Sequence, residues 1–189
     1  MKDLVLASSS PYRRELLQRL RIPFESMSPD IDEQPQPAES PEALVRRLSL
    51  EKAMAVAHRF DNHLIIGSDQ IAVNEGKLLT KPGNFDNAFN QLRSESGKKV
   101  HFLTGLALLD STTQHSQVDM VITEVIFRQL SDTEITEYLI NDTPYNCAGR
   151  FRSEGLGITL FDAVYSSDPT ALIGLPLISL NRMLMNTLK

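Results

Sequence analysis

The strongest constraint on the fold is a stretch at residues 63–73, in which two short apolar runs flank the sequence Gly-Ser-Asp-Gln. The runs, at 64–66 and 71–73, contain large or β-branched residues without polar alternation, which is typical of a strand covered on both faces. An aspartate in such a strand is costly unless it is paired, hydrogen-bonded or bound to a metal ion. Side-chain alternation puts Asp69 on the face of Gly67, whose missing side chain leaves that face open beside the carboxylate. The stretch therefore predicts either a catalytic or metal-binding Asp69 in the floor of a cleft, or a structural aspartate that caps a turn or helix.

Strand and helix signals alternate along the rest of the chain. Ser-Pro pairs at 10–11 and 40–41 have the pattern of a helix N-cap followed by the first helical position. The expected helices span 11 to about 20, 41 to about 60, 86–94, 131 to before 144, and the C-terminal residues after 176. The expected strands span 4–7, 24–27, 63–73, 100–109, 118–127 and 158–165, with 100–109 and 118–127 forming an antiparallel hairpin. This order predicts an α/β fold with a mixed sheet and flanking helices, in a single domain over residues 1–189.

Composition limits the partners and the compartment of the protein. The formal net charge is −5 and the sequence pI is about 5.4, which disfavours binding to nucleic acid or to an anionic membrane. The chain has one cysteine, so an internal disulfide bond is impossible, and it has no apolar stretch of membrane-spanning length. The first apolar residues are too few for a signal peptide. We therefore expect a cytoplasmic protein that acts on a small molecule.

The segment from Ser8 to Arg14 has the features of a phosphate-binding site. A strand, a serine-rich loop and a helix start occur in that order, and the N–H groups of a helix N-terminus attract anions. Arg13 and Arg14 lie in the first helical turn, where the helix dipole disfavours each cation by roughly 0.3–1 kcal/mol. An anion between them would explain their position, with Ser8 as a further donor. The alternative is a surface helix with two solvated arginines.

Other charged residues would complete such a site. Lys52 interrupts the apolar stripe of its helix, so its amine either reaches out to water or points into a cleft. With Arg13 and Lys81 it would neutralise a polyphosphate. Glu33 and Asp69 are the candidate acids, since Mg²⁺ or Mn²⁺ is often held by one or two carboxylates together with substrate phosphates. The alternative for Glu33 is a solvated acid in a proline-rich loop.

Three residues could recognise a nucleobase. The ring of Tyr12 would stack on a base, while a carboxylate such as Glu154 accepts hydrogen bonds from the donor-rich edge of guanine. Gln70 follows Asp69 directly. The alternatives are Tyr12 in the core, Gln70 at a strand edge, and Glu154 paired with Arg150 or Arg152.

Five segments in order resemble the Maf family of nucleotide pyrophosphatases: 6–17, 51–53, 67–70, 81–82 and 149–155. The resemblance covers nearly the whole chain and is most specific at 6–17 and 81–82. It implies an elongated α/β fold, shared with the inosine triphosphate pyrophosphatases, with a cleft between two lobes. It also implies hydrolysis of a nucleoside triphosphate between the α- and β-phosphates with a divalent metal cation, and a homodimer is plausible for this fold.

The resemblance extends to a subgroup and to individual roles. Tyr12, Gln70 and Glu154 resemble the specificity residues of bacterial relatives that hydrolyse 7-methyl-GTP, although those relatives usually have Trp in place of Tyr12. A cationic N7-methylguanine suits an aromatic face and a carboxylate. By the resemblance, Asp69 is the proton acceptor that activates water. The implied phosphate ligands are Ser8, Arg13, Lys52 and Lys81, and the implied metal ligand is Glu33.

Two other functions fit the same family. The first is a pyrophosphatase for dTTP or UTP, which changes the base and keeps the chemistry. The second follows from the link between Maf proteins and septum formation: a chain that inhibits septation by binding a division protein.

Overall fold

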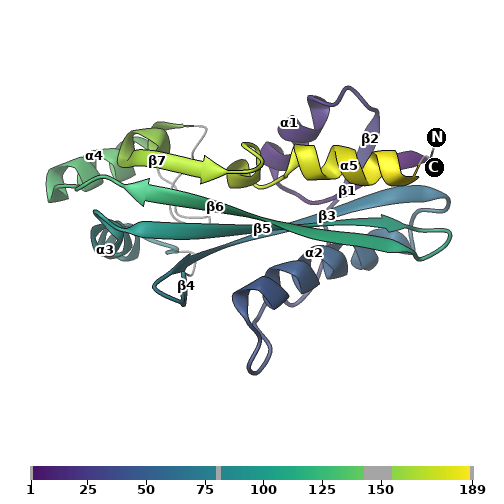
Figure 1. Ribbon diagram of the computed structural model, residues 1–189, viewed down its shortest axis with the longest axis horizontal. Helices are drawn as coiled ribbons and strands as arrows, with labels where there is room; N and C mark the ends of the chain where they lie inside the picture. The colour runs from purple at the N-terminus through teal and green to yellow at the C-terminus, as the bar shows by residue number, and fades with distance from the viewer. Residues whose placement is uncertain (1, 80–81, 143–154, 188–189) are drawn as a thin grey trace. The chain divides into compact units, whose positions relative to one another are not determined.

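The computed structural model describes residues 2–79, 82–142 and 155–187. Over these residues it is a mixed α/β fold with a seven-stranded sheet in the order β2-β1-β3-β5-β6-β7, with β4 paired to β3 (Figure 1). The strands are β1 (Asp3–Ala7), β2 (Phe24–Met27), β3 (His63–Asn74), β4 (Lys77–Leu79), β5 (Lys99–Asp110), β6 (Ser116–Phe127) and β7 (Phe161–Ser166). The α-helices are α1 (Pro11–Gln18), α2 (Pro41–Ala57), α3 (Phe85–Glu95), α4 (Asp132–Asp142) and α5 (Leu177–Thr187).

The predicted α/β class with a mixed sheet is confirmed. β1 pairs in parallel with both β2 and β3, whereas β4 pairs antiparallel with β3 and β7 antiparallel with β6. No helix in the described part of the chain has both the length and the apolar character needed to cross a bilayer.

Contacts divide the chain into two compact units. Unit 1 consists of Met1–Gln70, Thr104–Val121 and Asp168–Lys189, and unit 2 consists of Ile71–Leu103 and Ile122–Ser167. Three of the four boundaries fall inside β3, β5 and β6, and the fourth follows β7. The single domain over residues 1–189 and the cleft between two lobes both stay predictions.

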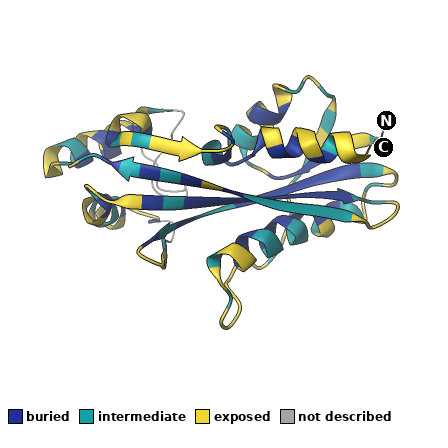
Figure 2. Cartoon of the chain, in the orientation of Figure 1, coloured by how far each residue is buried: buried dark blue, intermediate teal, exposed yellow. Residues whose placement is uncertain are grey.

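In unit 1, strand β3 is covered on both faces, as its apolar run predicts. Leu64 and Ile66 of β3 pack in one core cluster with residues of α1 and α5, while Ile65 packs in another with Ala53 and Val56 of α2. The three β3 residues are at most 5% exposed, and Figure 2 shows this part of β3 in the colour of buried residues. Asp69, 7% exposed, therefore lies in a strand that has little contact with water.

Local signals place the helix starts correctly. Ser10 Oγ accepts from Arg13 N at 3.4 Å, and Ser40 Oγ accepts from Ala43 N at 3.2 Å, so both Ser-Pro pairs begin helices. The predicted ends are too late by two or three residues. At the end of α1 the backbone N–H groups of residues 19–21 donate to carbonyls three residues earlier, and Arg21 has a φ of 55°, which no α-helix accommodates.

Unit 2 confirms the helices predicted at 86–94 and after Ser131. Ser131 Oγ accepts from Glu134 N at 3.2 Å and Glu134 Oε2 accepts from Ser131 N at 2.8 Å, which is a complete capping box. The strand predicted at 158–165 was too long at its start, because residues Leu156–Leu160 form the 3₁₀ helix η2. β7 begins at Phe161, whose ring packs edge-on against Phe127 at 5.1 Å between centroids.

Candidate active site

Helix α2 occupies the face of β3 that the sequence predicted to be open. A Cβ atom added to Gly67 would collide with the backbone oxygen of Ser49 and would lie 2.9 Å from Ala53 N. The prediction of an open face beside Gly67 is therefore wrong, and the glycine instead allows helix and strand to approach closely. The approach lets the buried Ser49 hydroxyl accept from Asp69 N at 3.1 Å while it donates to Val45 O at 2.7 Å. Ser49 thus tethers the backbone of Asp69 to α2.

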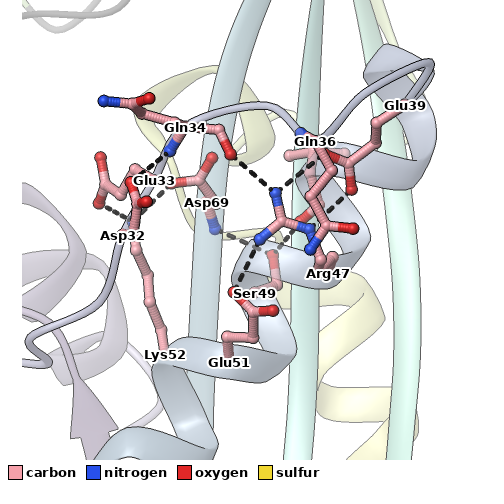
Figure 3. Close-up of polar contacts among 11 residues, drawn as sticks. Asp32, Glu33, Gln34, Gln36, Glu39, Arg47, Ser49, Glu51, Lys52 and Asp69 are labelled. Carbon is pink, nitrogen blue, oxygen red and sulfur yellow. Dashed lines mark hydrogen bonds and ion pairs between the residues drawn. The ribbon is translucent and has the colours of Figure 1, made fainter.

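Lys52 joins the two candidate acids. Its Nζ lies 2.5 Å from Asp69 Oδ1 and 2.7 Å from Glu33 Oε1 (Figure 3). The side chains of Lys52 and Asp69 are 8% and 9% exposed, while that of Glu33 is 50% exposed. The amine of Lys52 therefore does not reach out to bulk water. The ion pair resolves the cost of burying Asp69, because a buried charge is tolerated when an opposite charge and hydrogen bonds accompany it.

The loop that carries Glu33 is attached to α2 by Arg47 (Figure 3). Arg47 Nε donates to Glu39 Oε1 at 2.7 Å, Nη2 donates to Gln34 O at 3.1 Å, and Nη1 donates to Glu51 Oε2 at 2.8 Å. The hydrogen bond from Arg47 lowers the pKa of Glu39 to about 2, so this pair stays ionised over the neutral range. Sequence reasoning missed Arg47. Only its spacing to Glu51 was a visible signal, since the loop contacts depend on tertiary structure.

Arg13 brings a second cation near the two acids. Partial burial lowers the pKa of its guanidinium, while the nearby carboxylates of Asp69 and Glu33 oppose that shift. An arginine keeps its proton at neutral pH despite such a shift. Its Nε donates to Gly174 O at 2.7 Å, which fixes the head group at the start of α1. Arg14, by contrast, is exposed.

Ser8 and Tyr12 lie on either side of the start of α1. Ser8 is 7% exposed, and its Oγ accepts from Ser10 N at 3.1 Å, a bond that shapes the loop between β1 and α1. Tyr12 lies in the first turn of α1 and is half-buried. The strand-loop-helix arrangement predicted for a phosphate site is therefore present, and phosphate binding by Ser8 stays a prediction.

Gln70 is held by three acceptors. Its Nε2 lies 3.0 Å from Thr104 Oγ1, 2.9 Å from Ala171 O and 3.0 Å from Leu172 O. Because successive side chains of a strand point to opposite faces, Gln70 lies on the face of β3 opposite Asp69. Ser68 shares the face of Gln70. Thr104 was not recognised from the sequence because it is 34 residues from Gln70 and carries no motif.

The structure thus brings four of the predicted residues together, Arg13, Glu33, Lys52 and Asp69, all in unit 1. Lys81 and Glu154 lie outside the described residues. The catalytic, phosphate-binding and specificity roles all stay predictions.

The donor set suits a divalent metal cation. Across residues 2–79, 82–142 and 155–187, no three His, Cys, Asp or Glu side chains gather into a metal site. Glu33 and Asp69 nevertheless both reach Lys52 Nζ, so two carboxylates already meet at one cation. Mg²⁺ and Mn²⁺ sites that handle nucleotides often use one or two carboxylates and complete their shell with phosphate oxygens and water. These residues fit that pattern.

The fold and the charged cluster define an α/β protein in which two acidic and two basic side chains meet beside a buried strand. The chain belongs to the Maf-like protein family, whose model matches residues 3–187. The resemblance found in the sequence is thereby confirmed.

Three relatives with full-length similarity share a name. A protein of Pseudomonas aeruginosa is 56% identical over 98% of this chain and 96% of its own length. Proteins of Pseudomonas syringae pv. tomato and Hydrogenovibrio crunogenus are 55% and 51% identical, over 98% and 97% of this chain and 96% and 92% of their own lengths. All three are named 7-methyl-GTP pyrophosphatase.

Solved structures show a weaker likeness. The Staphylococcus aureus Ham1 protein matches with a TM-score of 0.49 and 12% identity, over 68% of this chain and 73% of that one. A nucleoside-triphosphatase (dITP/XTP pyrophosphatase) from Mycobacterium abscessus matches with a TM-score of 0.43 and 16% identity, over 68% and 75%. These values are too low to carry a conclusion about this chain.

Proposed function

We propose that the chain hydrolyses 7-methyl-GTP to 7-methyl-GMP and pyrophosphate. The observation that carries this proposal is the identity of 56%, over 98% of the chain, to a relative named 7-methyl-GTP pyrophosphatase. The enzyme class follows from the same names. A pyrophosphatase hydrolyses a phosphoanhydride bond, so the predicted class, a hydrolase acting on such bonds, is confirmed. The choice of base and the need for a metal cation stay predictions.

In this proposal Asp69 is the general base. Its carboxylate takes a proton from a water molecule. The oxygen of that water forms a bond to the α-phosphorus atom, while the bond from this atom to the oxygen that bridges the α- and β-phosphates breaks. Pyrophosphate leaves with the bridging oxygen. The bond from Asp69 N to Ser49 Oγ and the ion pair with Lys52 Nζ hold the carboxylate in place. Geometry of this kind supports a base because a proton acceptor must be pre-positioned.

Cations near Asp69 would hold the phosphates. Arg13 is anchored through Nε to Gly174 O, so its Nη groups are the donors that would meet a phosphate oxygen. Lys52, Ser8 and Lys81 would add further donors. A divalent cation held by Glu33 and Asp69 would neutralise charge that develops on the phosphate oxygens.

The hydrogen bonds of Gln70 favour a guanine-type base. Because its Nε2 is directed to Thr104 and to two backbone carbonyls, Oε1 is the atom that Gln70 would offer to a ligand. An acceptor suits the edge of guanine, which presents N–H donors at N1 and at the 2-amino group. Tyr12 and Glu154 would add stacking and a negative charge for the cationic methylated ring.

A panel of nucleotides tests the proposed substrate. We expect kcat/KM, measured by pyrophosphate release, to be at least about tenfold higher for 7-methyl-GTP than for GTP, UTP or dTTP. The positive charge of the methylated ring distinguishes it from all three, and the paired N–H donors of guanine distinguish it further from UTP and dTTP. A preference of the same size for UTP or dTTP would contradict the proposal and would instead support the pyrimidine triphosphate pyrophosphatase.

Removal of divalent cations tests whether hydrolysis requires a metal cation. We expect EDTA to abolish pyrophosphate release and excess Mg²⁺ or Mn²⁺ to restore it, because the phosphates bring more negative charge than the protein cations offset. Binding of Mn²⁺, followed by its electron paramagnetic resonance signal, should weaken in Glu33→Gln. The matched control is Glu15→Gln, which changes an exposed acid in α1. Full activity in EDTA would rule out the metal-assisted mechanism.

A further inference from the structure

A short segment at residues 168–177 supplies the carbonyl groups that hold two of the predicted site residues. Gly174 O accepts from Arg13 Nε at 2.7 Å, and Ala171 O and Leu172 O accept from Gln70 Nε2 at 2.9 and 3.0 Å. The same backbone therefore contacts the predicted phosphate ligand and the predicted base-selecting residue. All of these residues belong to unit 1.

Asp168 fixes the first end of this segment to helix α5. It is 1% exposed, and its Oδ1 accepts from Thr170 N at 3.2 Å. Its Oδ2 accepts from Ile178 N at 2.7 Å and from Ser179 N at 3.2 Å. These N–H groups lie in the first turn of α5, where they have no partner within the helix. A buried carboxylate therefore ties the start of the segment to the helix that follows it.

Thr170 closes the segment on itself. Its Oγ1 accepts from Leu177 N at 2.8 Å and lies 2.8 Å from both Asp168 Oδ1 and Leu175 O, the two acceptors available to its single proton. One hydroxyl group thus joins both ends of the segment, with the carbonyls of residues 171–174 between them.

Gly174 places the last of these carbonyls against Arg13. Its φ of +119° is a conformation that L side chains rarely adopt. A Cβ atom at this position would also lie 3.3 Å from Arg13 Nε. The backbone is therefore shaped so that Arg13 can approach it.

We propose that Asp168 and Thr170 are positioning residues that hold Arg13 and Gln70 in a fixed arrangement relative to each other. Phosphate binding and base selection then depend on the same segment. The inference rests on the roles that the proposed function gives to Arg13 and Gln70. Neither Asp168 nor Thr170 touches the substrate in this proposal. They act through the backbone carbonyls at 171, 172 and 174.

The test compares Thr170→Val with Thr170→Ser, which keeps the hydroxyl group. We measure kcat and KM for 7-methyl-GTP and GTP, and the inhibition constant of tripolyphosphate, which has the phosphate chain without a base. In Thr170→Val we expect a rise in that inhibition constant and a fall in the preference for 7-methyl-GTP over GTP, each of about fivefold or more. The reason is that a small displacement of a protein group that binds the substrate has a large effect on affinity and rate. Thr170→Ser should restore both values.

The matched control is Thr123→Val. Thr123 is fully buried, and its Oγ1 donates to Ser166 Oγ at 2.9 Å in unit 2. Thr123→Val removes a threonine hydrogen bond in the same way. The substitution should lower the melting temperature without changing the inhibition constant of tripolyphosphate or the preference for 7-methyl-GTP over GTP. If Thr170→Val does not fold, Thr170→Ala removes the same hydroxyl without placing a methyl group against the Asp168 carboxylate, and the same results are expected.

Two results would overturn the inference. In the first, the Thr170 variants lose stability while both values stay at those of the parent, which is a purely structural role. In the second, only one of the two values changes, which contradicts positioning as one unit. If the parent prefers another nucleotide, the proposed function fails in the parent itself. The inference is then tested with that nucleotide in place of 7-methyl-GTP. The preference for it over GTP and the inhibition constant of tripolyphosphate are compared between each variant and the parent.

Discussion

Asp69→Asn should reduce kcat by about 10²–10⁴-fold while the fold stays intact, because an amide cannot accept the proton of the attacking water. Asparagine matches aspartate in size, and the bond from the backbone N of residue 69 to Ser49 Oγ does not involve the replaced group. The ion pair with Lys52 is lost, so a modest loss of stability accompanies the loss of rate. Steady-state rates and circular dichroism on the same preparation measure the two effects.

Asp110→Asn is the matched control for this substitution. Asp110 Oδ1 lies 2.5 Å from Lys2 Nζ, the distance found between Asp69 and Lys52. The hydrogen bond from Lys2 lowers the pKa of Asp110 to about 2 from its ordinary 3.8. This pair therefore stabilises the fold above about pH 4 and loses its contribution as the pH falls through 2. Asp110→Asn should leave kcat unchanged at neutral pH. If Asp69→Asn keeps more than half of the parent kcat, Asp69 is not the base.

Gly67→Ala should destabilise the protein by about 3 kcal/mol, at the upper end of overpacking effects. The added Cβ would meet the backbone of α2 at Ser49 and Ala53 rather than a flexible side chain, so the helix itself has to move. Ser49 and Lys52 move with it, and both contact Asp69. Activity of the folded fraction should therefore also fall. Urea unfolding gives the loss of stability, and the rate per folded molecule gives the loss of activity.

Gly76→Ala separates this packing effect from the effect of replacing a glycine. Gly76 has a φ of +77°, and a Cβ atom there meets no atom within 4 Å. The substitution should cost about 1 kcal/mol of backbone strain and should leave the activity unchanged. Equal losses of stability at positions 67 and 76 would contradict the packing argument.

Elements with local signals could be predicted from the sequence. The Ser-Pro pairs before α1 and α2 and the capping box before α4 satisfy backbone groups within three residues of themselves, so they act without tertiary context. The burial of β3 was also predictable, because a run of apolar residues has to be covered on both faces. The start of β7 was not predictable, since apolar residues before it fit a 3₁₀ helix and a strand equally well.

The site could be predicted only in part. The cost of a buried carboxylate made Asp69 conspicuous, and the adverse helix dipole made Arg13 conspicuous. The direction of Lys52 could not be predicted, because the periodicity of a helix shows which face a residue occupies and not what lies opposite. The bonds of Arg47 to Gln34 O, of Ser49 to Asp69 N and of Asp168 to the start of α5 join residues that no local spacing connects.

By itself, the sequence determined the order of the helices and of all strands except β4, the starts of the helices, and the presence of a carboxylate that needs a partner. These features depend on interactions within a few residues or on the total amount of apolar surface. Only the tertiary structure decided that Lys52 is that partner, that α2 covers the face beside Gly67, and which groups bind Asp69 and Gln70 on the two faces of β3. The reason is physical: these contacts join residues 17 to about 100 positions apart, and the contacts between α2 and β3 also need the close approach that Gly67 allows.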